Sequence, residues 1–214
     1  MTDLLPLPGS RDEIIKIQSE RKRVAFERAK QAKWYKGKLD HINADRLDEP
    51  DEWQKIPIVD KDVLRKLDHK TFMEQFCIAP RADIAEYWRS GGTTGAPVFY
   101  PRTFRDVEYG MVTWGRSFPA MNIVPGDSCH ISFPIGDLTQ SSVSKIICSA
   151  EPLSDAKREK LARTWGAEVF NVFGMSEAGL MGAEGPAHDG IHIWSDMFFL
   201  EVVDPETGEM LEPG

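Results

Sequence analysis

The stretch KIICSAEPLSDAKREKLARTWGAEVFNVF, residues 145–173, decides the fold class of this chain. Residues 145–149 are mostly apolar and predict a short buried strand. Residues 154–165 predict a helix, because they begin with a serine that can cap it and are followed by Gly166, which can end it. Residues 168–173 predict a second strand. A strand, a helix and a strand in succession indicate an α/β unit with parallel strands.

The alternation of strands and helices continues on both sides of this stretch. Residues 85–103 have strand-like flanks around a turn rich in glycine and threonine, and residues 128–135 predict another strand. Downstream, residues 198–203 and the DPETGE turn, residues 204–209, predict a hairpin. We therefore expect an α/β fold with a multi-layered, mostly parallel sheet flanked by helices in residues 81–214.

Two helical segments frame that sheet in the sequence. Residues 1–80 are expected to form a helical N-terminal region, in which Ser10 and Glu13 make a capping box. A second helix is expected after Thr103. Its apolar residues recur at helical spacing and are expected to form one buried face. These residues are Val107, Met111, Trp114 and Phe118.

One connection is short for a parallel sheet. Only nine residues, 136–144, separate the strand expected to end at Ile135 from the strand that starts at Lys145. A crossover between parallel strands needs about a dozen residues or more. Either the two strands are antiparallel, or these residues are not the whole natural connection.

The composition excludes several functional classes. The chain has 214 residues, with 26 Lys and Arg against 34 Asp and Glu, and therefore a net charge of −8. Binding to nucleic acid or to anionic membranes is therefore not expected. The three cysteines form no CxxC pair, which favours small buried thiols in a reducing compartment. No signal peptide or membrane span is evident, so a cytoplasmic location is expected.

The strongest chemical signal is the segment SGGTTGAPV, residues 90–98. Three glycines let backbone amides approach an anion closely, and the three hydroxyl side chains add donors, so the segment can cradle a polyphosphate. It is not a Walker A loop, because no Lys-Ser/Thr pair follows it. The alternative interpretation is a plain hairpin turn.

Two further segments follow predicted strands. In NVFGMSEAG, residues 171–179, Ser176 can bond a phosphate oxygen and Glu177 can hold Mg²⁺. The alternative is a helix N-terminus with an acidic first turn. In SAEPLS, residues 149–154, the turn can hold an adenine or a ribose, although proline and serine also mark ordinary helix starts.

The order of these three segments resembles the adenylate-forming enzymes, the acyl-CoA synthetase superfamily, and most of all the phenylacetate–CoA ligases. IPIVDKDVLR, residues 56–65, and the segment from HDGIHIWSD to the end are also similar to that subgroup. The resemblance covers nearly the whole chain. It implies that the chain contains the N-terminal nucleotide-binding domain of such an enzyme, in part.

The resemblance also implies roles for individual residues. Ser176 stands where the family has a hydroxyl on the α-phosphate, and Glu177 matches the Mg²⁺ ligand; both are expected to be catalytic. The phosphate loop comprises Ser90, Gly91, Gly92, Thr93, Thr94 and Gly95. The segments beside the adenine comprise Ser149, Ala150, Glu151, Pro152, Phe173 and Gly174.

The implied reaction activates an aryl or acyl carboxylic acid similar to phenylacetate. Its carboxylate attacks the α-phosphate of ATP, with Mg²⁺ bound, and the thiol of coenzyme A then displaces AMP. Relatives of this kind suggest a homodimer. The alternative function is a nucleotide-binding module without ligase activity, a sensor or an interaction domain.

The chain departs from the family pattern in two places. The family has a long segment between residues 136 and 137 that carries much of the acid pocket, and this chain lacks it. The family also continues beyond Gly214 into a small C-terminal domain with a catalytic lysine. The chain is therefore expected to be a fragment or an incomplete form of such an enzyme.

Overall fold

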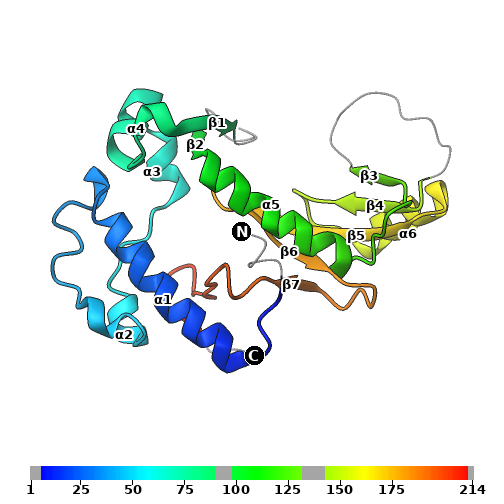
Figure 1. The fold of residues 1–214 in the computed structure, drawn as a ribbon, viewed down its shortest axis with the longest axis horizontal. Coiled ribbons are helices and arrows are strands. Elements are labelled where there is room, and N and C mark those ends of the chain that lie inside the picture. The colour runs from blue at the N-terminus through cyan, green and yellow to red at the C-terminus, as the bar shows by residue number, and fades with distance from the viewer. Residues whose placement is uncertain (1–5, 90–97, 132–142, 212–214) are drawn as a thin grey trace. The chain divides into compact units, whose positions relative to one another are not determined.

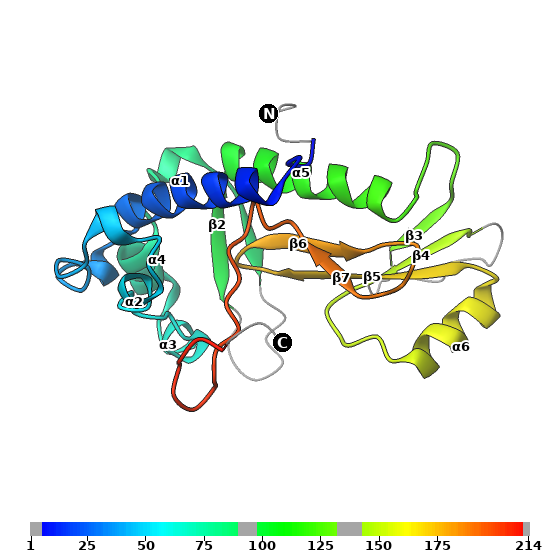
Figure 2. The same ribbon diagram turned by 90° about the horizontal axis from the view of Figure 1, so that it is seen from below.

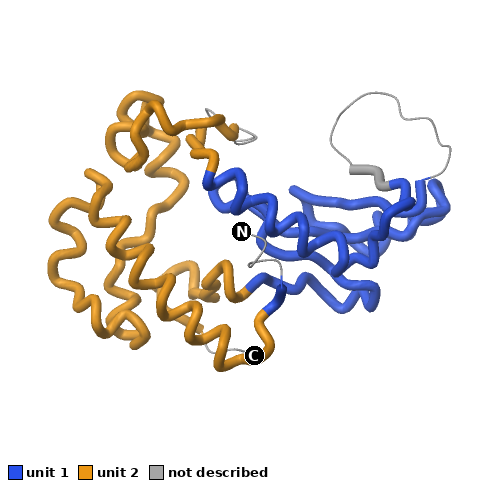
Figure 3. The backbone as a smooth tube through the Cα atoms, viewed as in Figure 1, with its two compact units in different colours: residues 1–7, 105–194 blue, residues 8–104, 195–214 orange. Residues whose placement is uncertain are grey.

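A computed structural model describes residues 6–89, 98–131 and 143–211, and for residues 129–131 it describes the backbone alone. The chain forms two compact units (Figure 3). The first comprises Met1–Leu7 and Arg105–Trp194, and the second comprises Pro8–Phe104 and Ser195–Gly214. The domain boundary expected near residue 80 stays a prediction. Residues 81–104 belong to the second unit, together with the N-terminal helices.

The second unit contains the N-terminal helices, which begin at capping residues. α1 (Arg11–Ala29) starts after Ser10, whose hydroxyl accepts a hydrogen bond from the Glu13 amide at 3.2 Å. The Glu13 side chain in turn accepts a bond from the Gly9 amide at 2.7 Å, which completes a variant of the capping box. The other elements are 3₁₀ turns at Lys33–Tyr35, Ala44–Arg46 and Arg81–Asp83, and the helices α2 (Pro50–Trp53), α3 (Lys61–Arg65) and α4 (His69–Phe76). None of the helices in the described ranges is long and apolar enough to cross a membrane.

A two-stranded hairpin in the second unit carries the ends of the Gly/Thr-rich segment. β1 (Ile84–Arg89) pairs antiparallel with β2 (Phe99–Thr103), with Arg89 opposite Phe99. Val98 and Tyr100 pack with residues of α3 and α4 in a buried apolar cluster. The strand-like flanks predicted from the sequence are therefore confirmed.

The first unit is built around a five-stranded sheet, in the order β3-β4-β5-β6-β7 (Figure 1). The strands are β3 (Cys129–Ile131), β4 (Lys145–Cys148), β5 (Glu168–Met175), β6 (Gly179–Glu184) and β7 (Ile191–Ile193). The pairs β3–β4 and β4–β5 are parallel, whereas β5–β6 and β6–β7 are antiparallel. The sheet is therefore mixed, because its last three strands are joined by hairpins.

The pairing of β3 with β4 decides between the two interpretations of the short connection. The strands are parallel, so the antiparallel alternative is wrong. β3 is described as far as Ile131 and β4 begins at Lys145, so the expected strand end at Ile135 lies outside the described residues. Most of the connection between the two strands, residues 132–142, also lies outside them.

Helices cover both faces of this sheet, α5 (Phe104–Ala120) on one and α6 (Asp155–Trp165) on the other (Figure 2). α6 has the boundaries expected from its sequence. The Ser154 hydroxyl accepts a hydrogen bond from the Lys157 amide at 3.3 Å, and Gly166 ends the helix with a left-handed φ of 62°. Apolar residues of α6 pack against the strands in one cluster, which includes Ile146, Val169, Leu161, Ala162 and Trp165.

The prediction that Val107, Met111, Trp114 and Phe118 form one buried face of α5 is wrong. Met111 is 63% exposed and Phe118 is 37% exposed, so this side of the apolar stripe faces solvent. The buried side chains of α5 are Val112, Thr113, Arg116 and Ser117. These polar groups reach nearby carbonyls: Ser117 donates to the Thr113 carbonyl at 2.8 Å, and Arg116 donates to the Pro6 carbonyl at 3.1 Å. A mostly polar helix face is thus buried because its donors are satisfied.

The last residues belong to the second unit and lie along α1. The Gln18 side chain donates to the Ser195 carbonyl at 2.7 Å, and the Lys22 ammonium lies 3.7 Å from the centre of the Phe199 ring. At the hairpin expected from residues 198–209, an isolated bridge joins Val203 to Met210, and backbone hydrogen bonds run from the Asp204 amide to the Glu209 carbonyl and from the Leu211 amide to the Val202 carbonyl. The Asp204 carboxylate holds its turn by accepting two backbone amides.

Candidate functional site

The segment that follows β4 contains the residues expected to line an adenine pocket. Ser149, Ala150, Glu151 and Pro152 are all exposed. Ala150 has a φ of 74°, a left-handed conformation that residues other than glycine rarely adopt. Glu151 forms an ion pair with Lys157 of α6 at 3.3 Å. The helix-start interpretation is also correct for this segment, because Ser154 caps α6.

The segment that follows β5 is a tight turn between two strands. β5 continues to Met175, residues 176–178 form the turn, and β6 begins at Gly179. The helix N-terminus considered as the alternative for Ser176 and Glu177 is therefore wrong. The apolar sequence on both sides of the turn forms a hairpin, with Met175 opposite Gly179.

Gly174 occupies a position where a side chain would collide with the neighbouring strand. A Cβ at this residue would lie 2.5 Å from the Gly179 carbonyl oxygen. The adjacent Phe173 is 40% exposed, so its ring presents an apolar surface to solvent at the end of the strand. Glycine is thus required here by the close approach of β5 and β6.

The two segments begin at the same edge of the sheet. β4 and β5 are parallel neighbours, and Cys148 lies opposite Asn171. Ser149 follows the first of these residues directly, and Phe173 lies two residues beyond the second. The structure therefore places the starts of the Ser149–Pro152 and Phe173–Glu177 segments near the same level of two neighbouring parallel strands, at the carboxyl side where open α/β sheets bind ligands.

A cavity of about 570 Å³ opens beside the first segment. Its lining comprises residues 148–153 together with Lys157, Lys160, Leu161, Thr164 and Trp165 of α6. Apolar side chains and two lysine ammonium groups share this wall. Such a wall can accept a flat apolar group that carries an anionic substituent.

The Gly/Thr-rich segment cannot be placed beside these residues. Ser90, Gly91, Gly92, Thr93, Thr94 and Gly95 lie outside the described residues. Its flanks, β1 and β2, belong to the second unit, whereas both other segments belong to the first. Its role in binding phosphate stays a prediction.

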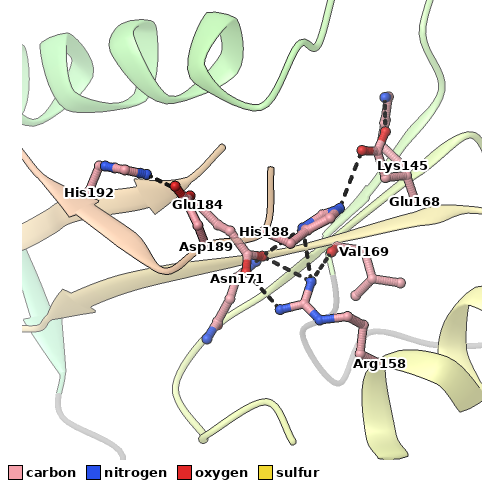
Figure 4. Close-up of polar contacts among 9 residues, drawn as sticks. All are labelled: Lys145, Arg158, Glu168, Val169, Asn171, Glu184, His188, Asp189 and His192. Atoms are coloured by element: carbon pink, nitrogen blue, oxygen red, sulfur yellow. Dashed lines mark hydrogen bonds and ion pairs between the residues drawn. The ribbon is translucent and has the colours of Figure 1, made fainter. Parts of the chain in front are cut away.

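Sequence reasoning missed a polar network next to this edge (Figure 4). Its centre is Glu184, the last residue of β6, whose side chain is only 4% exposed. Both terminal nitrogens of Arg158 donate to its carboxylate, at 2.8 and 3.0 Å, and the Asn171 amide donates to it at 2.9 Å. A glutamate inside the otherwise apolar stretch GLMGAE was the available signal, because such a charge requires a partner.

His188 extends the network toward the start of β5. Its Nδ1 lies 3.3 Å from Glu184 and its Nε2 lies 3.4 Å from Glu168, which also pairs with Lys145. Its ring lies 5.1 Å from that of Phe170. His188 lies in the loop before β7. Within the described ranges, no group of His, Cys, Asp and Glu side chains is arranged to hold a metal ion.

Burial and hydrogen bonding shift two pKa values in this region. Burial alone would raise the pKa of the Glu184 carboxyl, but the bonds from Arg158, the Asn171 amide and His188 together lower it below its usual value of 4.5. Glu184 is therefore charged at neutral pH. Burial raises the pKa of the Cys148 thiol, which favours its protonated form and fits a structural role.

Comparison with solved structures identifies the class of fold. The chain superimposes on a crystal structure of 2-hydroxyisobutyryl-CoA ligase in an open conformation, in complex with 2-HIB-AMP and CoA. The TM-score is 0.74 at 15% sequence identity, over 94% of this chain and 58% of the ligase. Over 94% of its length, the chain therefore has the fold of the adenylate-forming CoA ligases, and it covers 58% of the solved ligase.

Comparison with curated sequences points to a particular group within that class. The chain is 25% identical to the phenylacetate–coenzyme A ligase of Aromatoleum evansii, over 99% of this chain and 63% of the relative. It is also 25% identical to the enzyme of the same name from Thermus thermophilus, over 95% of this chain and 60% of the relative. The similarity to phenylacetate–CoA ligases expected from the motifs is therefore confirmed. No protein-family model matches the chain.

The coverage of these matches is partial. The chain spans about three fifths of the length of the curated relatives it matches. The matched region with the Aromatoleum enzyme is 280 positions long, whereas the chain has 214 residues. Part of the relative's matched region therefore has no counterpart in this chain.

Proposed function

We propose that this chain carries the nucleotide-binding part of an AMP-forming ligase. Such an enzyme activates a small aryl or acyl carboxylic acid, similar to phenylacetate, and transfers it to coenzyme A. The observation that supports this most directly is the position of the two segments at the carboxyl ends of β4 and β5. The same fold holds 2-HIB-AMP and CoA in a solved ligase, which supports the nucleotide assignment.

The first half of the reaction joins two anions. The carboxylate of the acid attacks the α-phosphate of ATP, and pyrophosphate leaves with the electrons of the broken P–O bond. Positioning and charge neutralisation carry such a step. In this proposal Ser176 donates a hydrogen bond to the α-phosphate, and the residues of the 90–95 loop donate to the outer phosphates.

The residues present fit a magnesium ion through their donor chemistry. Glu177, in the turn after β5, offers carboxylate oxygens, and Mg²⁺ takes one or two carboxylates together with phosphate oxygens and water. When bound, the ion neutralises charge on the phosphates. In that arrangement the Glu177 side chain would fix the position of the positive charge relative to Ser176.

The second half transfers the acyl group. The sulfur of coenzyme A attacks the acyl carbonyl of the adenylate, the bond to AMP breaks, and the thiol proton passes to solvent. The proposed partners are thus a small carboxylic acid, ATP and coenzyme A. A homodimer and a cytoplasmic location remain expectations from the sequence.

The proposal is tested by exchange of labelled pyrophosphate into ATP, with phenylacetate as the acid and Mg²⁺ present. Replacing Glu177 by alanine should lower the exchange rate about 10²–10³-fold, the usual effect of removing one preorganised electrostatic group. Glu206→Ala is the matched control, because Glu206 is an exposed acid in another turn of the chain. Near-normal exchange by the Glu177 variant would refute the assignment.

A second candidate is a nucleotide-binding module without ligase activity. Such a module would share the 90–95 loop and Glu177 with the ligase. Saturable binding of ATP without pyrophosphate exchange by the unchanged chain would support this candidate. Exchange that depends on phenylacetate would exclude it.

A further inference from the structure

Among the residues that the structure describes, no strand pairs with one side of β5 at its beginning. The pairing of β5 with β6 runs only as far as Val172 opposite Ala183. If it continued, Glu184 would lie opposite Asn171, and Pro186 would lie opposite Val169. Proline has no amide hydrogen to donate. The backbone groups of residues 169 and 171 on this side therefore need other partners.

Two side chains supply those partners. Arg158 of α6 donates from Nη1 to the Val169 carbonyl, and the Asn171 amide donates to Oε2 of Glu184 at 2.9 Å. The two side chains are joined to each other by both terminal nitrogens of the arginine. This paired fork, which we call the Arg158–Glu184 clamp, replaces the missing part of the strand ladder (Figure 4).

The clamp stands next to the start of both site segments. Its partner Asn171 lies opposite Cys148, the last residue of β4. Ser149 begins one segment immediately afterwards, and Phe173 begins the other after two residues of strand, about 7 Å. The clamp therefore fixes α6, β5 and β6 at the level where the two segments diverge.

Physical chemistry argues against stability as the main effect of this pair. The Glu184 side chain is 4% exposed and that of Arg158 is 23% exposed, so both charges have lost most of their hydration. Replacing a buried ion pair by apolar residues of similar volume is often neutral or stabilising, whereas removing one partner is costly. What the ion pair adds is a fixed geometry of several hydrogen bonds.

We propose that Glu184, held by Arg158, is a positioning residue for the nucleotide site. It sets where the Phe173–Glu177 segment stands relative to the Ser149–Pro152 segment, so that both contact one adenine nucleotide. This inference rests on the proposed function, since it assigns a nucleotide to that edge. A small displacement between such segments is enough to weaken binding or catalysis by one to two orders of magnitude.

The decisive variant is the double replacement Arg158→Met with Glu184→Leu. It removes both charges at once, so no buried charge is left unpaired. It also leaves the Val169 carbonyl and the Asn171 amide without these partners, so some stability is lost and binding is measured well below the unfolding temperature of the variant. Its affinity for ATP with Mg²⁺, measured by calorimetry, should fall about 10- to 100-fold. Arg163→Met and Glu159→Gln, at exposed positions of the same helix, are the controls and should leave the affinity unchanged.

Glu184→Gln provides a second test in case the double variant fails to fold. The amide oxygen can still accept the Asn171 hydrogen bond, but the charge on Arg158 loses its partner. We expect partial rescue: an ATP affinity between those of the unchanged protein and of Glu184→Ala. Equal affinities for all three, below the temperature at which any of them unfolds, would overturn the proposal.

Hydrogen exchange separates a failure of this inference from a failure of the proposed function. In the double variant, backbone amides of residues 171–177 should exchange faster, while those of α5 should not change. If the unchanged chain does not bind ATP but this local change occurs, the proposed function fails and the clamp remains as a device that orders the edge. If the double variant binds ATP normally, or the amides are unaffected, the inference is wrong.

Discussion

The two helices that cover the sheet of the first unit differ in how they use their sequences. α6 is capped by Ser154 and Gly166 and turns Leu161, Ala162 and Trp165 toward the strands. α5 leaves Met111 and part of Phe118 in solvent and buries Thr113, Arg116 and Ser117 instead. Helical periodicity therefore predicts which residues share a face, but the neighbouring elements decide which face is buried.

The largest effect is expected beneath α6. Ile146 of β4 is 1% exposed and lies in the apolar cluster that α6 covers. Replacing it by alanine should lower the free energy of unfolding by about 2–5 kcal/mol, because methyl groups are lost and a cavity remains. Urea unfolding of the first unit measures this value. If Ile146→Ala lowered the free energy of unfolding by less than Met111→Ala does, the contrast between the α6 side and the α5 side of the sheet would be contradicted.

An effect that depends on pH is expected where α6 contacts β6. The Glu184 carboxyl has a lower pKa in the folded chain than its usual value of 4.5, through its bonds from Arg158, Asn171 and His188. It therefore contributes stability above about pH 4.5, and this contribution is lost as the pH falls through the folded-state pKa. The difference in unfolding free energy between the unchanged protein and Glu184→Gln should shrink as the pH falls below 4.5. A difference that is the same at every pH would contradict the assignment.

A smaller effect is expected at the end of α6. Gly166 has a φ of 62°, and a Cβ there would meet no atom within 4 Å. Gly166→Ala should therefore lower the free energy of unfolding by about 1 kcal/mol, through backbone strain alone. Gly185→Ala is the matched control, since that residue has no left-handed φ and the nearest atom to a new Cβ is at 3.9 Å. Equal thermal unfolding of the two variants would show that Gly166 is not constrained as described.

The smallest effect is expected on the outer face of α5. Met111 is 63% exposed, so Met111→Ala should change the free energy of unfolding by less than about 0.5 kcal/mol. Chemical unfolding at several protein concentrations checks this value. A loss of several kcal/mol would mean that the stripe is covered in solution, and the contrast with α6 would then disappear.

The sequence predicted those parts of the fold that depend on local signals. Capping residues placed the start of α1 and both ends of α6, and short stretches with strand-like composition placed β1, β4 and β5. The sequence correctly placed Ser176 and Glu177 after a strand. It did not predict that they form a hairpin turn, because a hairpin needs a partner strand and no local pattern identified β6 as that partner. The same limit explains why a predicted helix face turned outward in α5.

The missed part of the candidate site depends on contacts between residues far apart in the chain. Arg158 and Glu184 are separated by 26 positions, and their meeting depends on how α6 crosses the sheet. No spacing rule connects them. The buried glutamate alone indicated that a partner exists, and the packing of the helix determined which arginine it is.

The left-handed backbone at Ala150 limits how this position can vary. An L-residue with a φ of 74° carries a strain of roughly 1–2 kcal/mol, from which glycine is exempt and which asparagine tolerates better than most side chains. In a library of all substitutions at residue 150, glycine and asparagine should therefore survive heating better than alanine, while valine and isoleucine should be lost. The segment beside the proposed adenine pocket is thus open to improvement by a substitution that adds no contact at all.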